Sequence, residues 1–300
     1  MVTLKYKLLY FDSVKKDLCL KMEDLQEMKL FSGIGFELSN LGNLTKTLQS
    51  NDCSCCQIFL SGTKQYKPRK LSGTEIEESC KLCLDKNMTC YVHCPYVINL
   101  ASEDSGVRSR GRESVLDHLR QTSDFPCSCV LHTGSGKIST VANELNSMLI
   151  PVGKYVTPLL LEVCAGEGKK IGSTETDIRK VWESLDSPSD RIGLCLDTQH
   201  LFASGMCDFS SNESVVKLFE NMESIVGKVG LVHINDSAVV RLSKKDRHAS
   251  IGEGHIWGTD LSTLGSVINY CQSSKVDMVL ETYISPKKIK ILGDLYTQFI

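Results

Sequence analysis

Histidine and carboxylate residues recur at the ends of short apolar runs along the whole chain. The positions are His93, His132, Glu162, Asp197, His200, His233, His248 and Glu281. One histidine after an apolar run is usually a satisfied structural residue, but separate explanations for so many ligand-type residues are jointly improbable. A single polynuclear metal site explains them together, and imidazole with carboxylate suits zinc, manganese or iron.

Such a metal site predicts hydrolytic chemistry on an anionic substrate. Zinc polarises phosphoryl oxygens and lowers the pKa of bound water toward about 7. With Asp246 counted beside Glu162, Asp197 and Glu281, four carboxylates against three divalent ions would leave a net charge of about +2 in the pocket. A cationic pocket favours a phosphate ester over a neutral sugar.

Apolar runs separated by polar or amphipathic stretches set the order of the predicted elements. Several runs are continuous rather than alternating, which is typical of strands buried on both faces of a parallel sheet. The predicted strands cover residues 33–38, 56–60, 88–93, 127–132, 158–163, 192–197, 230–235 and 277–282. The predicted helices cover residues 43–50, 74–85, 114–122, 141–149, 178–185, 214–226 and 261–273.

This alternation over about 260 residues predicts an α/β fold of the (β/α)8 TIM-barrel type. A doubly wound open sheet is the alternative, but the sequence lacks the glycine-rich loop of its nucleotide-binding versions. Active sites of barrels lie at the C-terminal ends of the strands, where the ligand-type residues fall. We predict one barrel domain over residues 32–300 and an N-terminal extension over residues 1–31.

The composition is that of an ordinary globular protein, with 41% hydrophobic and 23% charged residues. No run approaches the roughly 18 apolar residues that a membrane span needs. The lysine-containing start offers no small-residue cleavage site, so we expect an intracellular protein of the cytoplasm or nucleus. A formal net charge of −2 does not indicate a polyanion partner, but bound metal ions would add positive charge.

Fourteen cysteines would suggest a disulfide framework in a secreted protein, but a core of this size does not need such crosslinks. We expect most of the thiols to be buried and reduced. One group comprises Cys53, Cys55, Cys56, Cys80 and Cys83. A disulfide or an additional zinc site stays open for this group, although no matching ligand pairs flank it at zinc-finger spacing.

Several sequence blocks resemble, in order, the motifs of the endonuclease IV family of apurinic/apyrimidinic (AP) endonucleases. They are HCPYVINLAS (93–102), VLHTGSG (130–136), LLLEVCAGEGKKIG (159–172), IGLCLDTQHLFASG (192–205), LVHINDS (231–237), KKDRHASIGEGHI (244–256) and LET (280–282). The resemblance spans residues 32–282. Its D-T-x-H, H-x-N-D-S and D-R-H-x-x-I-G-x-G blocks are hard to obtain together by chance.

The resemblance implies a TIM barrel that holds three zinc ions and acts on double-stranded DNA with abasic sites. His93 and His132 would hold the first zinc, Glu162 would bridge the first and second, Asp197, His233 and Glu281 would complete the second, and His200, Asp246 and His248 would hold the third. The implied reaction is hydrolysis of the phosphodiester 5′ to the abasic site, which leaves a 3′-hydroxyl and a 5′-deoxyribose phosphate. We also expect 3′-phosphodiesterase activity and a monomeric enzyme. Activated water would be the nucleophile, so no side-chain nucleophile is needed, and Glu162 is the expected catalytic residue.

The resemblance also assigns DNA contacts to three residues. Tyr96, three residues after His93, matches a family position in the DNA-binding groove. Lys64 and Tyr66 lie in the loop after the second strand, where the family inserts residues into the damaged duplex. Extrusion of an abasic nucleotide costs less than that of an intact one. An ordinary solvated loop is the alternative for Lys64 and Tyr66.

Three positions depart from the family pattern. Glu37 stands where a histidine is common, Val163 where an asparagine follows the bridging glutamate, and Gln199 where a cysteine is frequent. Glu37 would accept a hydrogen bond beyond the ligands or alter metal affinity. These departures and the N-terminal extension would fit an unusual lineage, such as a viral one. All nine implied ligands are nevertheless present.

Two other functions compete with the nuclease. A xylose-isomerase-like sugar isomerase or epimerase shares the pattern of histidines and carboxylates at strand ends, but it has no use for a third metal pair such as Asp246 and His248. A catalytically inactive DNA-binding barrel would be indicated by the loss of a ligand. No implied ligand is missing from the sequence.

Overall fold

The computed structural model describes most of the predicted barrel domain. Its described residues are 34–38, 54–123, 127–149, 157–186, 191–282, 291–292 and 294–295. The predicted extension over residues 1–31, the predicted helix over residues 43–50 and Cys53 lie outside the described residues.

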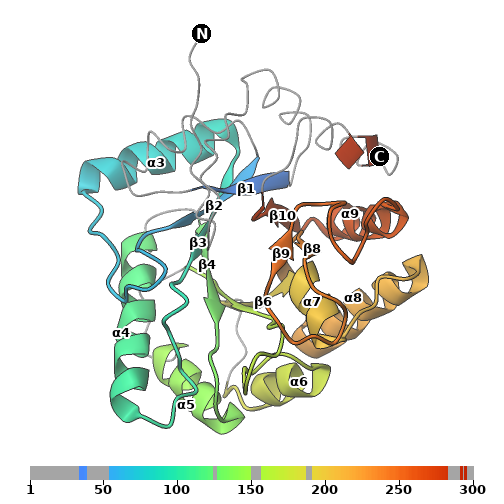
Figure 1. Ribbon diagram of the computed structural model, residues 1–300. Coiled ribbons are helices and arrows are strands. Elements are labelled where there is room, and N and C mark those ends of the chain that lie inside the picture. Colours follow the sequence, from blue (N-terminus) through green and yellow to red (C-terminus); the bar gives the residue numbers. More distant parts are fainter. Residues whose placement is uncertain are drawn as a thin grey trace.

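Eight parallel strands form a closed barrel, which confirms the predicted TIM-barrel fold (Figure 1). They are β1 (Ile34–Leu38), β2 (Cys55–Phe59), β3 (Thr89–His93), β4 (Cys127–His132), β5 (Leu159–Glu162), β6 (Ile192–Asp197), β7 (Val229–His233) and β10 (Asp277–Leu280). β1 pairs with β10, with Ile34 opposite Met278, so the barrel leaves no open edge. Every predicted apolar run therefore contributes one barrel strand.

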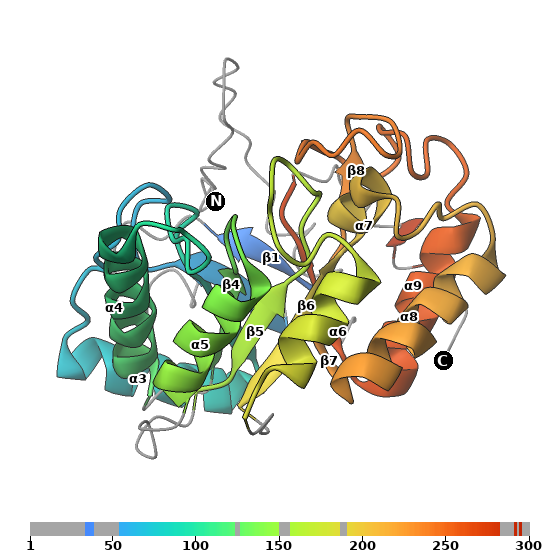
Figure 2. The ribbon, with the colours of Figure 1, turned by 90° about the horizontal axis from the view of Figure 1, so that it is seen from below.

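Helices pack around the outside of the barrel (Figures 1 and 2). They are α3 (Gly73–Lys86), α4 (Ser105–Thr122), α5 (Ile138–Leu149), α6 (Glu175–Glu183), α8 (Asn212–Val226) and α9 (Ser262–Ser274). The short helix α7 (Thr198–Ser204) and the strand pair β8 (Asp236–Ser237) and β9 (His248–Ala249) lie in the connections after β6 and β7. Among the described residues, no helix is both long and apolar enough to cross a membrane.

Two helices differ most from the sequence-based prediction, while α5 and α6 each begin three residues earlier than predicted. Helix α4 begins at Ser105 instead of residue 114, because the Asp104 carboxylate caps its first turn and accepts a hydrogen bond from the Gly106 amide at 2.7 Å. Gly106 and Gly111 lower the helix propensity of this turn-rich segment and conceal the start in the sequence. Helix α7 has only seven residues and was not predicted.

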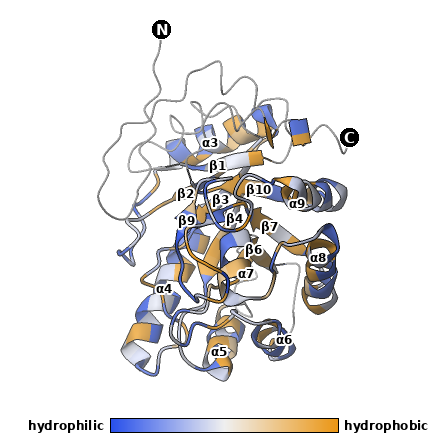
Figure 3. Cartoon of the chain, turned by 45° about the vertical axis from the view of Figure 1, so that its right-hand side comes forward, coloured by the Kyte–Doolittle hydropathy of each residue, from blue (hydrophilic) through white to orange (hydrophobic). Residues whose placement is uncertain are grey.

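Alternate residues of each strand point into the barrel and fill its interior. This inner layer consists of Cys55, Tyr91, Val130, Leu160, Cys195, Leu231 and Val279, all of which are buried. β1 places Gly35 beside Cys55 at the same level, where a Cβ atom would lie 1.9 Å from the Cys55 carbonyl oxygen. Hydrophobic residues also dominate strands such as β7 in Figure 3, because their other face packs against the helices.

The described cysteines are free thiols, and most are buried. Cys55 belongs to the inner layer, whereas Cys56 and Cys83 belong to the outer core between strands and helices. Within the described ranges, no cysteine belongs to a group of side chains close enough to share a metal ion. These thiols therefore act as small apolar side chains, as expected from the sequence.

Replacement of Leu160 by alanine tests the inner layer. Leu160 is only 4% exposed, so Leu160→Ala should lower the free energy of unfolding of the metal-free protein by about 2–5 kcal/mol. Leu84→Ala is the matched control, because Leu84 is 72% exposed and its truncation should change stability by less than about 0.5 kcal/mol. Equal denaturant midpoints for the two variants would contradict this description of the core.

Candidate metal centre

A second ring of side chains lies directly beyond the inner layer, at the C-terminal ends of the strands. Its members are Glu37, Gln57, His93, His132, Glu162, Asp197, His233 and Glu281, each two residues after a member of the inner level. Side chains two residues apart on a strand point to the same side. The strand period therefore turns all of them inward, and six of the eight are predicted ligands.

Glu162 lies at the centre of this ring, surrounded by imidazoles. Its Oε2 atom is 3.0 Å from Nε2 of His93 and 3.2 Å from Nε2 of His132. Its Oε1 atom is 3.2 Å from Nδ1 of His233 and 3.4 Å from Nδ1 of His200. One buried carboxylate thus faces four histidines, as a bridging ligand would.

The described residues form three groups whose ligand atoms lie within 4.8 Å of one another. The groups are His93, His132 and Glu162; then Glu162, Asp197, His233 and Glu281; and finally Asp197, His200 and His248. The first two groups have the composition that the resemblance implies. The third contains Asp197 in place of Asp246.

Asp246 nevertheless lies beside the third group. Its Oδ2 atom is 3.3 Å from Nε2 of His200, and its Oδ1 atom is 3.4 Å from Nε2 of His248. Asp246 therefore faces the same two imidazoles that Asp197 approaches. All nine ligand positions named from the sequence come together at one end of the barrel.

Local structure after β6 positions His200. Asp197 ends this strand and also caps helix α7, since its Oδ1 atom accepts a hydrogen bond from the backbone amide of His200 at 2.8 Å. The cap brings the imidazole of His200 to the metal centre within one helical turn. Buried Gln199 donates a hydrogen bond to the backbone oxygen of Lys245 at 3.0 Å and so ties α7 to the loop that carries Asp246.

Three histidines use one ring nitrogen for a structural hydrogen bond and turn the other toward the carboxylates. The structural contacts join His93 Nδ1 to Cys94 O at 2.6 Å, His200 Nδ1 to Val163 O at 2.9 Å, and His233 Nε2 to Gln57 Oε1 at 2.8 Å. Metal-binding histidines typically have such an anchor. Among the described residues, the buried Nε2 atoms of His200 and His248 have no hydrogen-bond partner, which leaves both atoms available to bind a metal ion. The donor set therefore fits divalent cations.

Burial and charge shift the pKa values in this site in opposite directions. Burial alone would raise the pKa of Glu162, but the imidazoles of His132 and His233 outweigh it and hold this pKa well below its usual range. Burial lowers the pKa of His132 to about 4, which leaves its imidazole neutral and able to bind a metal at pH 7. The pKa of His200 is raised well above its usual value, because Asp197 and Asp246 outweigh burial.

Two amide side chains that were not predicted support the ligands. Asn235 Nδ2 donates hydrogen bonds to Asp197 Oδ2 at 2.7 Å and to Glu281 Oε2 at 2.8 Å. Gln57 Nε2 donates to the other oxygen of Glu281, also at 2.8 Å. Amides are weak metal ligands, so their presence in a sequence does not indicate a metal site. The position of Gln57 two residues after inward-facing Cys55 could nevertheless have identified it as a member of the ring.

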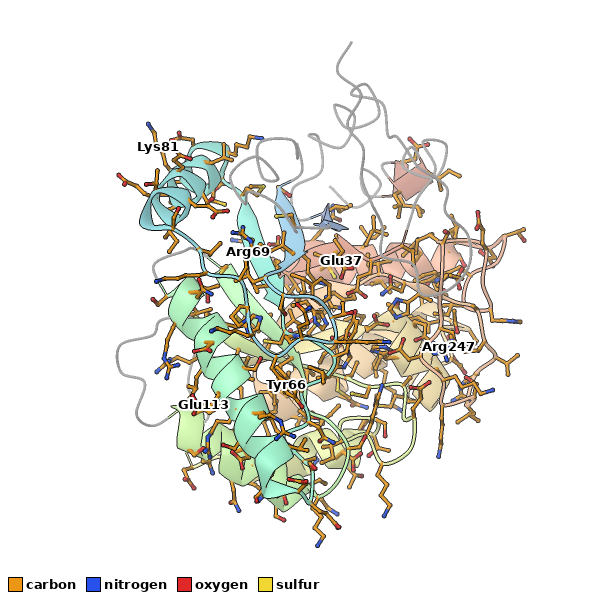
Figure 4. All side chains as sticks on the ribbon, turned by 60° about the vertical axis from the view of Figure 1, so that its left-hand side comes forward. Glu37, Tyr66, Arg69, Lys81, Glu113 and Arg247 are labelled. Carbon is orange, nitrogen blue, oxygen red and sulfur yellow. The ribbon has the colours of Figure 1, made fainter. Side chains whose placement is uncertain are left out.

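A cavity of about 840 Å³ opens above the ring. Its walls include seven of the nine proposed ligands, all but Asp197 and His233, together with Thr63, Tyr96, Lys170 and Arg247. Figure 4 labels Glu37 and Arg247, which line this cavity, and Lys81 on α3, which does not. The cavity therefore joins the metal-ligand groups to an aromatic ring and two cationic side chains.

The three predicted DNA-contacting residues occupy different environments. Tyr96 is 46% exposed, and its ring centroid lies 5.1 Å from that of His93. Lys64 is exposed in the loop after β2. Tyr66 is partly buried against the outer core, with the guanidinium of Arg110 5.9 Å from its ring centroid. Its carbonyl oxygen also accepts a hydrogen bond from Ser114 of α4.

Comparisons with known proteins place the chain among enzymes that share this barrel. Residues 46–289 match the family model of the xylose isomerase-like TIM barrel. A "Probable endonuclease 4" of Halothermothrix orenii is 32% identical over 241 residues, which are 77% of this chain and 84% of that protein.

Solved structures with the same barrel include an endonuclease IV and a sugar epimerase-like protein. The crystal structure of endonuclease IV from Thermus thermophilus superimposes with a TM-score of 0.76 and 25% identity, over 89% of this chain and 98% of that one. A D-tagatose 3-epimerase-like protein has a TM-score of 0.63 at 19% identity, over 89% of this chain and 98% of that one, and is a likeness of fold alone. The chain therefore belongs to the endonuclease IV family of nucleases, within the xylose isomerase-like TIM barrels.

Proposed function

We propose that this protein is a zinc-dependent AP endonuclease of DNA base excision repair. It hydrolyses the phosphodiester 5′ to an abasic site in double-stranded DNA and leaves a 3′-hydroxyl and a 5′-deoxyribose phosphate. A 3′-phosphodiesterase activity accompanies incision. The observation that carries the proposal is the convergence of Glu162 and the other eight ligand-type residues at one end of the barrel, where seven of the nine line an open cavity.

Each part of this site has a separate task in the proposed reaction. Zinc ions would supply Lewis acidity toward a phosphate and an activated water. Glu162 sets the spacing between the first two ligand groups, because it belongs to both. His200, His248 and Asp246 form the side of the site that would stabilise the departing oxygen. Separate stabilisation of attack and departure suits phosphodiester cleavage better than sugar isomerisation.

The walls of the cavity suit a DNA backbone. Lys170 and Arg247 both contact Glu167, with Nζ of Lys170 3.4 Å from Oε2 and NH1 of Arg247 3.6 Å from Oε1. Their cationic groups would contact phosphates and add affinity without reading base sequence. Tyr96 would pack against the sugar and base edges beside the metal groups, and Lys64 would reach the duplex from the loop after β2.

Tyr66 has a different role in this proposal. Its partly buried ring and its hydrogen bond to Ser114 hold it against α4. Tyr66 would therefore shape the loop that presents Lys64 to DNA. Insertion of Tyr66 into the duplex would require this packing to break.

The remaining features of the proposal follow from the substrate. An enzyme that repairs genomic DNA would act inside the cell, in the cytoplasm or nucleus. One chain supplies all nine proposed ligands, so a monomer would suffice. Residues 32–300 would form the catalytic domain, preceded by the extension over residues 1–31.

Removal and restoration of zinc tests this function. Purified protein should contain about three zinc ions per chain. Treatment with EDTA should abolish incision of a duplex with one abasic site, and added zinc should restore it. Intact duplex of the same sequence is the control substrate. Undiminished incision by protein shown to be zinc-free would defeat the proposal.

Replacement of Glu162 by glutamine tests the bridge. An amide cannot balance charge between two divalent ions, so Glu162→Gln should lower kcat by about 100-fold or more, given that even partners of metal ligands contribute 10- to 100-fold. The circular dichroism spectrum should stay unchanged. Glu113→Gln is the control, because Glu113 is exposed on α4. Full activity with full zinc content in Glu162→Gln would remove Glu162 from the site.

Replacement of Lys64 by alanine separates DNA binding from chemistry. Loss of one phosphate contact should weaken binding of abasic duplex and reduce the slope of log Kd against log salt by about 1. Zinc content and thermal stability should not change. The matched control is Lys81→Ala on α3, since Lys81 is exposed and distant from the cavity (Figure 4). Identical salt slopes for the two variants would show that Lys64 does not contact DNA.

A further inference from the structure

Two members of the inward-facing ring, Glu37 and Gln57, have no part in the proposed reaction. β1 and β2 are neighbouring strands, and their register places Glu37 directly opposite Gln57. Gln57 is fully buried, and Glu37 lines the cavity. Among the residues that the structure describes, neither belongs to one of the three ligand groups.

Gln57 uses the hydrogen-bonding groups of its amide on three ring members. Its Nε2 atom donates to Glu37 Oε2 at 2.9 Å and to Glu281 Oε1 at 2.8 Å. Its Oε1 atom lies 2.8 Å from Nε2 of His233. The opposite amide orientation would direct the carbonyl oxygen at the Glu281 carboxylate, which can only accept, so this partner determines which end of the amide faces which residue.

This orientation also determines which nitrogen of His233 can bind a metal. The Gln57 carbonyl oxygen can only accept, so Nε2 of His233 must carry the proton and donate. The lone pair then lies on Nδ1, which is 3.2 Å from Glu162 Oε1 and 3.4 Å from Glu281 Oε1. Nδ1 is thus the nitrogen that faces the second ligand group.

Glu281 is held from two sides. Gln57 donates to Oε1, and Asn235 donates to Oε2 at 2.8 Å. The two amides restrict rotation of the carboxylate and leave its remaining lone pairs for a metal ion. Gln57 therefore contacts both His233 and Glu281 of the second group, and Glu37 accepts a hydrogen bond from the same amide.

We propose that Glu37 and Gln57 form a pair of positioning residues that selects Nδ1 of His233 as a ligand and orients Glu281 for the second metal ion. The inference rests on the proposed function, because it presumes that the second group binds zinc. Glu37 acts through Gln57 and does not itself bind the ion. Partners of this kind typically contribute 10- to 100-fold to metal affinity.

Zinc retention in a series of variants tests the pair. Increasing chelator should remove one of the three ions from Gln57→Met at about 10- to 100-fold lower concentration than from the wild type. The other two ions should be retained as in the wild type. Glu37→Leu, which removes the acceptor without altering Gln57, should release the same ion early. Glu113→Gln is the control for general effects on stability.

The conservative variant Glu37→Gln distinguishes a positioning residue from a ligand. Its amide oxygen can still accept the hydrogen bond from Gln57, so wild-type zinc retention should largely return. A direct ligand would not be replaced by an amide, so early zinc loss in Glu37→Gln would overturn the assigned role of Glu37.

Nitrogen-15 NMR of histidine-labelled, zinc-loaded protein gives a readout independent of activity. Wild-type His233 should have a protonated Nε2 and a metal-bound Nδ1, and this pattern should be lost or mixed in Gln57→Met. Unchanged zinc retention together with an unchanged His233 pattern in Gln57→Met would overturn the inference. A wild-type protein that binds no zinc would instead overturn the proposed function, so the two failures are distinguishable.

Discussion

Carboxylate charge buried at the mouth of the barrel is the constraint on which the rest of this structure depends. Glu162 and Asp197 are buried, and the side chain of Glu281 is only 6% exposed. An unpaired buried carboxylate costs several kcal/mol, so each must meet compensating groups. The amides of Gln57 and Asn235 supply hydrogen bonds, and imidazoles such as that of His200 supply positive charge. The same arrangement leaves ring nitrogens and carboxylate oxygens directed at common points, which is the geometry of a metal centre.

The barrel makes this concentration of charge possible. Closure between β1 and β10 brings together residues that are more than 240 positions apart in the chain. The strand period of two then determines which of them face inward, and a register slip of one residue would turn them toward the helices. The hydrophobic layer around Leu160 closes the barrel beneath the charged ring and excludes water from that side. The alternation of side chains along each strand therefore determines both the packing of this layer and the composition of the charged ring.

The strands and eight of the nine proposed ligand positions could be predicted from the sequence because both have local signals, whereas Asp246 was named only from the family resemblance. Continuous apolar runs indicate strands buried on two faces, and histidine or carboxylate at the end of such a run, as in His132 and Glu162, indicates the catalytic end of a barrel. The start of α4 was missed because its glycines lower helix propensity, and α7 was missed because a helix of seven residues is too short to show a clear periodicity. The hydrogen bond between Gln57 and His233 and the packing of Tyr66 on α4 join segments that are distant in the sequence, and no local sequence pattern indicates such contacts.

The most direct test of the metal centre is X-ray diffraction from zinc-loaded crystals at energies just above and below the zinc absorption edge. Anomalous difference density locates zinc without reference to activity. Three peaks should lie around Glu162, with one beside His93 and His132, one beside His233 and Glu281, and one beside His200 and His248. Peaks confined to the cysteines, or no peak within bonding distance of Glu162, would contradict a metal centre at this end of the barrel.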